Sequence, residues 1–237
     1  ADATALAKIN GGIYSLNVTA VTAAGTATVI ANTHVVGFLV TDTAANIRVA
    51  ANLTALINAG SKLVSITESG TVGAIALTAA QYTSTFTAKF TNFTATVSGV
   101  LAANAGAATA DAKVSGVTVS DTAANITAKI ADLIAAGTKL TSIAETGTIS
   151  TVALTAAQYS TTLTAKFSNF TATVSGVAAA NAATVLTNTK VASIAVSDTA
   201  ANLATNLNAL QTAGTKLTTI TNADNGVLSI TVTQLTA

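Results

Sequence analysis

Three aspartates are the most regularly placed residues that could do chemistry. Asp42, Asp121 and Asp198 each open the phrase Asp-Thr-Ala-Ala-Asn. A carboxylate can accept a proton or bind a cation, but no pair of acids in the sequence has the spacing or apolar setting that general acid–base catalysis needs. An aspartate directly before an apolar run at helical spacing is instead typical of a helix N-cap. We therefore interpret all three as structural caps.

The remaining reactive side chains recur poorly. His34 is the only histidine, and lysine occupies the matching positions later in the chain. A Ser-His-Asp set cannot be built on a histidine that does not recur. Glu68 and Glu145 recur once and are predicted to lie in glycine-containing turns. The chain has no cysteine, which excludes thiolate chemistry. We expect no catalytic residue, no cofactor and no metal, and therefore no enzyme.

One weak metal candidate is the segment 222–226, Asn-Ala-Asp-Asn-Gly. Its oxygen-bearing side chains and glycine are loosely like a calcium loop. It lacks the acidic density of known calcium loops, and an Asn-Gly turn is the better interpretation.

The chain repeats one sequence about three times. The offset is 77 residues almost everywhere, as between Leu77–Tyr82 and Leu154–Tyr159, which both spell Leu-Thr-Ala-Ala-Gln-Tyr. Repetition at this period is typical of arrays whose units stack on their neighbours. We therefore predict one continuous solenoid over residues 1–237, with repeats near 1–77, 78–154 and 155–237.

Each copy is predicted to contain three strand-then-helix units. The Asp phrases begin the clearest helices, which end at Gly60, Gly137 and Gly214. A second helix is expected from Thr155 through Phe167, and a third over Ala178–Thr187. Short β-branched runs between them predict strands. The interval around Glu145-Thr146-Gly147 has room for a hairpin.

These units predict an α/β fold, a solenoid with parallel strands and helices outside. The alternative is an Ala/Thr-rich β-helix without true helices, because alanine-rich segments also fit tight β-coils.

The two chain ends are predicted to complete one another. Leu235-Thr236-Ala237 followed by Ala1-Asp2 restores the phrase that begins at Leu77 and at Leu154. This seam favours either a slice of a longer array or a subunit that continues head to tail. Strands are expected near both ends, around Tyr14–Val18 and Leu228–Val232. Their apolar positions are the candidate assembly residues: Tyr14, Leu16, Val18, Leu228, Ile230 and Val232.

The composition excludes two classes of partner. Charged residues are only 8% of the chain and the net charge is +1, so the sequence has no polybasic footprint for nucleic acid. The longest strongly apolar run, Val35–Val40, is too short to span a bilayer. Low charge with many hydroxyl groups suits a surface that associates with other copies.

The pattern over Asp121–Ile143, followed by Leu154–Gln158, resembles Ala/Thr-rich repeat modules of giant bacterial secreted and cell-surface proteins, those associated with RTX or S-layer proteins. The resemblance implies an extracellular structural or adhesive role. The chain lacks the calcium-binding nonapeptides of RTX proteins.

The leading hypothesis is an extracellular structural protein: a self-associating filament, sheath or surface-layer component, or the stalk of a giant adhesin, located outside the cell or at its surface. The alternative is a binding module whose Thr-bearing strand face contacts ice, a glycan or a mineral. Thr94/Thr96 and Thr171/Thr173 are spaced two apart, as one strand face requires.

Overall fold

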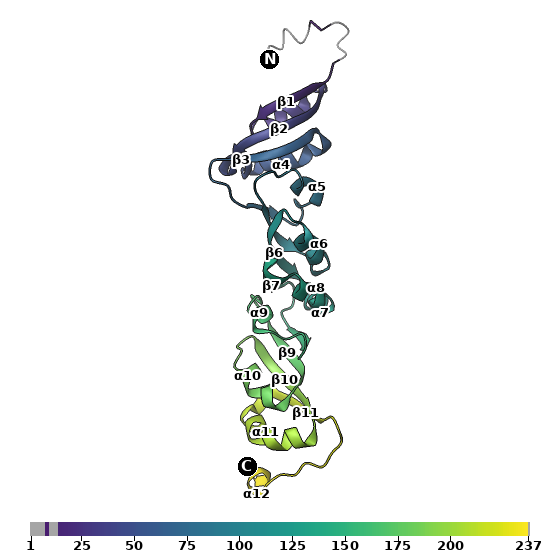
Figure 1. The fold of residues 1–237 in the computed structure, drawn as a ribbon, viewed down its shortest axis with the longest axis vertical. Helices are drawn as coiled ribbons and strands as arrows, with labels where there is room; N and C mark the ends of the chain where they lie inside the picture. Colours follow the sequence, from purple (N-terminus) through teal and green to yellow (C-terminus); the bar gives the residue numbers. More distant parts are fainter. Residues whose placement is uncertain (1–7, 10–13, 237) are drawn as a thin grey trace. The chain divides into compact units, whose positions relative to one another are not determined.

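The computed structural model describes residues 8–9 and 14–236. It shows an α/β protein in which short helices alternate with parallel strands (Figure 1). The described chain divides into two compact units, one formed by the residues up to Ser98 with Ala110–Gly116, the other by Gly99–Thr109 with the residues from Val117 onward.

The strands form three sheets. The first has the order β1 (Leu16–Val21), β2 (Val35–Thr43), β3 (Leu63–Ser69). The second contains β4 (Ile75–Thr78), β5 (Ala95–Val100), β6 (Val114–Asp121) and β7 (Leu140–Glu145). The third contains β8 (Thr151–Thr155), β9 (Thr171–Val177), β10 (Val191–Asp198) and β11 (Leu217–Asn222). The pairs β1–β2, β2–β3, β4–β5, β6–β7, β8–β9, β9–β10 and β10–β11 are parallel.

Sheet breaks recur after β3 and after β7. The hairpin expected at Glu145-Thr146-Gly147 is therefore wrong, because β7 and β8 belong to different sheets. At the second break an isolated parallel β-bridge joins Ile143 to Phe167. At the first break Ile66 and Phe90 form the same bridge.

The helices after the Asp phrases are confirmed, but only one is continuous. α11 (Ala200–Thr212) is unbroken, whereas the other copies divide into α3 (Ala44–Ile47) with α4 (Ala50–Asn58), and α7 (Ala123–Ala128) with α8 (Ile130–Ala135). Each ends before its predicted glycine, and Gly60, Gly137 and Gly214 have positive φ values of 55°, 58° and 55°. This left-handed conformation suits the residue just after a helix C-cap. A 3₁₀ turn then leads into the next strand, at Gly60–Lys62, Gly137–Lys139 and Gly214–Lys216.

The other expected helices had different outcomes. The Ala178–Thr187 helix is confirmed as a 3₁₀ turn, Ala179–Asn181, followed by α10 (Ala182–Leu186). Its counterparts are α2 (Thr26–Ala31), and Ala102–Asn104 followed by α6 (Ala105–Ala110). The long helix from Thr155 to Phe167 is wrong, because only the single turn α9 (Thr161–Thr164) forms, as does α5 (Ser84–Thr87) in the preceding copy. Threonine has low helix propensity, and Phe167 leaves the helix to bridge Ile143.

Small and branched apolar side chains form the core of each unit. In the first unit Phe38, Leu56 and Ile66 are fully buried, and in the second Ile126, Leu133 and Ile143 are. In the second unit α10 packs on β10 and α11 on β11 (Figure 1). The helices therefore supply the apolar cover that one face of each sheet needs.

Candidate assembly interface

The recurring aspartates lie at strand ends and bind two separate segments. Asp121 is the last residue of β6, and its Oδ2 accepts from the Ala102 amide at 2.9 Å, while Oδ1 accepts from the Thr122 amide at 2.8 Å and Asn125 Nδ2 at 2.7 Å. Asp42 and Asp198 make the same three contacts in their copies. Each carboxylate therefore ties the start of one helix to the end of the next strand.

The predicted N-cap role of these aspartates is wrong by one residue. Thr122 is the N-cap of α7, and its Oγ1 accepts from the Asn125 amide at 3.3 Å. Thr43 and Thr199 cap their helices in the same way. In each of the three copies the residue after the aspartate supplies the capping oxygen, while Asp42, Asp121 and Asp198 lie in the preceding strand.

Hydrogen bonding lowers the pKa of these carboxyls. Burial raises the pKa of Asp121, but the bonds from Asn125, Ala102 and Thr122 outweigh it and hold the pKa below its usual value. The pKa of Asp42 is lowered by the same balance.

A buried glutamate marks each sheet break. The prediction that Glu68 and Glu145 lie in turns is wrong, because they belong to β3 and β7 and are buried. Glu145 Oε2 accepts from the Ser150 amide at 2.7 Å, and the side chain is almost fully buried. Asn169 brackets its backbone, with Oδ1 accepting from Glu145 N and Nδ2 donating to Glu145 O, both at 2.9 Å. Glu68 and Asn92 repeat the arrangement. The signal was the shared 24-residue spacing from Glu to Asn.

One tyrosine–acid contact has the appearance of a chemical site. Tyr82 Oη donates to Asp111 Oδ2 at 3.2 Å, and Thr87 Oγ1 donates to the same oxygen at 2.6 Å. Burial, and then the Asp111 carboxylate, raise the pKa of Tyr82. In the next copy Asn188 replaces the aspartate and donates to Tyr159 Oη at 3.2 Å. Because an amide serves equally well there, we interpret this cluster as a structural link between loops.

His34 and the calcium candidate also have structural partners. The His34 ring stacks on Tyr14 with centroids 4.1 Å apart, and Nδ1 lies 3.2 Å from the Tyr14 carbonyl oxygen. Asp224 Oδ1 accepts from the amides of Ala200 and Gly226, both at 3.0 Å. Over residues 8–9 and 14–236, no group of three or more His, Cys, Asp or Glu side chains is placed to hold a metal.

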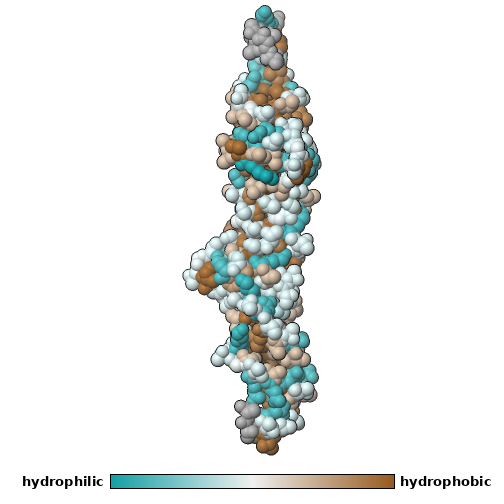
Figure 2. Space-filling view, turned by 90° about the vertical axis from the view of Figure 1, so that its left-hand side faces the viewer, coloured by the Kyte–Doolittle hydropathy of each residue, from teal (hydrophilic) through white to brown (hydrophobic). Residues whose placement is uncertain are grey.

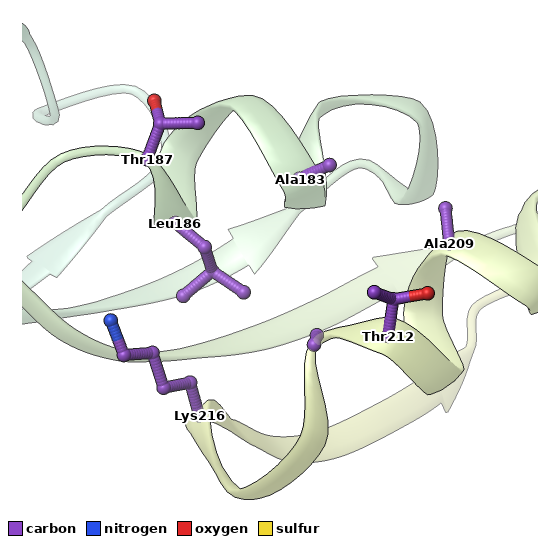
Figure 3. Close-up of a pocket in the computed structure, with 7 residues that line it drawn as sticks. Ala183, Leu186, Thr187, Ala209, Thr212 and Lys216 are labelled. Carbon is purple, nitrogen blue, oxygen red and sulfur yellow. The ribbon is translucent and has the colours of Figure 1, made fainter.

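A hollow of about 250 Å³ lies between α10 and α11 (Figure 3). Its hydroxyl groups are already bonded, since Thr187 Oγ1 donates to Thr184 O at 2.7 Å and Thr212 Oγ1 to Asn208 O at 2.9 Å. The rest of its lining is Ala183, Leu186, Ala209, Ala213 and Lys216. This lining has no nucleophile paired with a base.

The most informative contact is the parallel pairing of strand β8 with strand β9, which we call the joint. The chain forms the same joint between β4 and β5. Val152 pairs with Ala172 and Leu154 with Val174. The exposed fractions of Val152 and Leu154 are 0% and 2%. The earlier joint has the same register, with Ile75 opposite Ala95 and Leu77 opposite Val97. A second contact accompanies each joint, because Phe167 bridges Ile143 and buries both side chains.

The C-terminal segment repeats one half of this joint. Thr231 N donates to Gln234 Oε1 at 2.9 Å, as Thr155 N does to Gln158 Oε1 and Thr78 N to Gln81 Oε1. Ile230 therefore corresponds to Leu154, and Leu228 to Val152. The matching phrase begins at Ile230, five residues before the expected seam at Leu235.

The strand predicted around Leu228–Val232 is not formed. Leu228 and Ile230 lie in irregular chain, and Val232 begins the short helix α12 (Val232–Thr236). Both Leu228 and Ile230 are 38% exposed. Ile220, the counterpart of Ile143, is 44% exposed. In Figure 2 hydrophobic residues lie at the surface at the lower end of the view, where Figure 1 places α12. We call Ile220, Leu228 and Ile230 the C-terminal face.

The first sheet presents the other half of the joint. β1 corresponds to β5 and β9, and Leu16 and Val18 are half-buried where Ala172 and Val174 are fully buried. No strand among residues 8–9 and 14–236 pairs with the outer edge of β1. Ile9, which aligns with Phe167 in the phrase Ala-Lys-Ile/Phe, is 42% exposed. We call Ile9, Leu16 and Val18 the N-terminal face. Of the other candidate residues, Tyr14 lies beside this face and stacks on His34.

No helix in the described part of the chain is long and apolar enough to cross a membrane; the longest, α11, has 13 residues. Comparison with known proteins gave no matching family model, no similar curated protein and no similar solved structure.

Proposed function

We propose that the chain is an extracellular structural protein that associates head to tail, as a filament, sheath or surface-layer component or as part of an adhesin stalk. In this proposal residues 1–237 form a single solenoid of repeats near 1–77, 78–154 and 155–237, and each junction between molecules continues the solenoid.

The observation that carries the proposal is the joint that the chain forms twice internally. Its two halves appear again without a partner among the described residues, as the C-terminal face and the N-terminal face. Exposed apolar side chains and an open strand edge favour pairing with another chain. Because the two faces differ, the contact is heterologous, and such contacts produce open assemblies unless the rotation closes a ring.

Internal bonding also supports a structural role. Some lysine ammonium groups donate to backbone carbonyls, as Lys139 Nζ does to Thr109 O at 2.8 Å and Lys190 Nζ to Ser168 O at 3.1 Å. Charged residues are only 8% of the chain, so few charges oppose association between copies. The location outside the cell rests on the resemblance of the repeats, and antibody labelling of intact cells of the source organism tests it.

The Thr-bearing strand face remains the alternative, with ice, a glycan or a mineral as its partner. Its hydroxyls are partly used within the sheet, since Thr94 Oγ1 donates to Ser115 Oγ at 3.1 Å. This bonding favours the assembly proposal over surface binding.

Sedimentation velocity over a range of concentrations, with electron microscopy, tests the proposal. The unmodified chain should form a concentration-dependent series of oligomers or filaments, and Ile230→Lys should abolish them. Val227→Lys is the matched control. Val227 is 89% exposed and lies outside the C-terminal face, so this substitution adds the same charge without changing that face. A chain that stays monomeric up to about 1 mM would contradict the proposal, since a weaker contact could not sustain assembly.

A further inference from the structure

We propose that the partner at the N-terminal face is the segment Leu228–Thr231 of a second copy, added as a parallel strand to the outer edge of β1, with Leu228 opposite Leu16 and Ile230 opposite Val18. The proposal rests on the proposed head-to-tail function and specifies its contact.

The strand counts indicate which strand could extend the first sheet. Among the residues that the structure describes, the second and third sheets have four strands, and the first has three, β1 to β3. By repeat position, β1 to β3 correspond to β9 to β11, so a strand added beside β1 takes the place of β8. The segment Leu228–Thr231 has that sequence position and already makes the Thr–Gln contact that follows β8. Adding it to β1 gives a four-stranded sheet like the other two.

The register follows from two internal precedents that agree. Leu77 lies opposite Val97 and Leu154 opposite Val174. Ile230 and Val18 hold these positions, and Leu228 and Leu16 hold those of Val152 and Ala172. A shift by one residue would turn the apolar side chains toward the opposite face of the sheet, so the register is strongly specified.

Hydrogen bonds from hydroxyl groups across the joint support the same register. Ser98 Oγ donates to Leu77 O, and Ser175 Oγ to Leu154 O, each at 3.3 Å across the joint. Thr19 holds the position of these serines, so its hydroxyl faces the carbonyl of Ile230 in the second copy. The Leu228 amide likewise meets the Ser15 carbonyl, as the Ile75 amide meets the Thr94 carbonyl at 2.9 Å.

A second contact accompanies the strand. Ile143 is buried by its bridge with Phe167, and Ile66 by its bridge with Phe90. Their counterparts are Ile220 of one copy and Ile9 of the other, both more than a third exposed. In the proposed contact Ile220 and Ile9 form a further apolar pair, as Ile143 and Phe167 do inside the chain.

Cysteine cross-linking tests the register directly, because the chain has no cysteine of its own. Asn17 and Ser229 are exposed and would lie opposite each other, as Ala76 and Thr96 do inside the chain. Chains carrying Asn17→Cys and Ser229→Cys, with different tags, are mixed at about 1 mM and oxidised mildly. The off-register control pairs Ser229→Cys with Thr19→Cys, about 7 Å further along the strand. The intrachain pair Ala76→Cys/Thr96→Cys calibrates the yield.

The expected result is a mixed dimer of Asn17→Cys with Ser229→Cys at least tenfold more abundant than with Thr19→Cys. Equal or reversed yields would overturn the register while leaving assembly intact, as sedimentation of the unmodified chain would show. If disulfides between two Asn17→Cys chains dominated, they would indicate two-fold pairing and overturn the proposal. A monomeric unmodified chain would instead reject the proposed function, and this proposal with it.

Discussion

Thr231 and Gln234 are joined by the same pair of side-chain bonds as Thr155 and Gln158. The Gln234 Oε1 accepts from the Thr231 amide at 2.9 Å and from its hydroxyl at 3.2 Å, and both distances are repeated in the internal copy. Gln234 Nε2 also donates to Ala204 O at 3.1 Å, which fixes the segment to α11. The last described turn therefore has the conformation that follows strand β8, the first strand of the internal joint.

The strand-end aspartate should matter more to stability than the helix cap beside it. Asp121→Ala removes the acceptor of the buried Ala102 amide and is expected to cost about 1–3 kcal/mol. Thr122→Ala removes only a cap and should cost about 1 kcal/mol. Urea denaturation measures both. Asp132→Ala is the control, because its surface pair with Lys129, at 3.5 Å, should contribute less than about 1 kcal/mol. Equal losses at Asp121 and Asp132 would show that the Asp121 contacts are not stabilising.

Acid should destabilise the protein through these same carboxyls. The folded chain lowers the pKa of Asp42 and Asp121, so the unfolded chain binds more protons as the pH falls. Their contribution is fully present above the ordinary carboxyl pKa of about 4 and is lost as the pH falls through the lowered folded values. The free energy of unfolding, measured between pH 7 and pH 2, should decrease below about pH 4. The decrease should be smaller in Asp121→Asn, and an unchanged pH profile in that variant would contradict the assignment.

Ala20, in strand β1 at the proposed junction, has a strained backbone conformation. Ala20 has φ of 56° at the position where Gly99 and Gly176 have 71° and 70°. Left-handed backbone is unfavourable for a residue with a Cβ, so Ala20→Gly should raise the free energy of unfolding by up to about 1 kcal/mol. Gly176→Ala should lower it by about 1 kcal/mol, for backbone reasons alone, because nothing lies within 4 Å of an added Cβ. Thermal unfolding of both variants checks this, and changes of the same sign would refute it.

The asparagine at each sheet break should contribute about as much to the free energy of unfolding as a core side chain does. Asn169→Ala leaves both the amide and the carbonyl of the buried residue Glu145 without their partner, with an expected cost of about 2 kcal/mol in urea denaturation. Asn206→Ala is the control, because its single bond, to Asn202 O, lies on an exposed helix surface. Asn169 would have no such role if both variants unfolded at the same urea concentration.

The sequence was sufficient to predict the repeated strand–helix units, the parallel strands and the glycines that follow the helices. These features depend on local propensity and on periodicity. Asp121 was misassigned because its decisive partner, the Ala102 amide, lies 19 residues earlier in the chain. Phe167 was placed in a helix because its spacing from Leu163 is helical, but its bridge to Ile143 is a tertiary contact.

The assembly residues show a different limit. Leu228 and Ile230 have strand composition, yet a strand forms only where a neighbour supplies hydrogen bonds. No such neighbour is present among the described residues. The Thr-x-x-Gln spacing shared by Thr78, Thr155 and Thr231 was the signal in the sequence that could have located the seam correctly.

The most direct test of head-to-tail association is to mix two variants, each blocked at one face. Ile230→Lys blocks the C-terminal face and Val18→Lys the N-terminal face, and thermal unfolding first confirms that both variants fold. In sedimentation velocity each variant alone should be monomeric, and an equimolar mixture should give one discrete dimer and nothing larger, because one functional face of each kind remains. A mixture that stays monomeric, although the unmodified chain assembles and both variants are folded, would contradict the account. Dimers formed by either variant alone would contradict it equally.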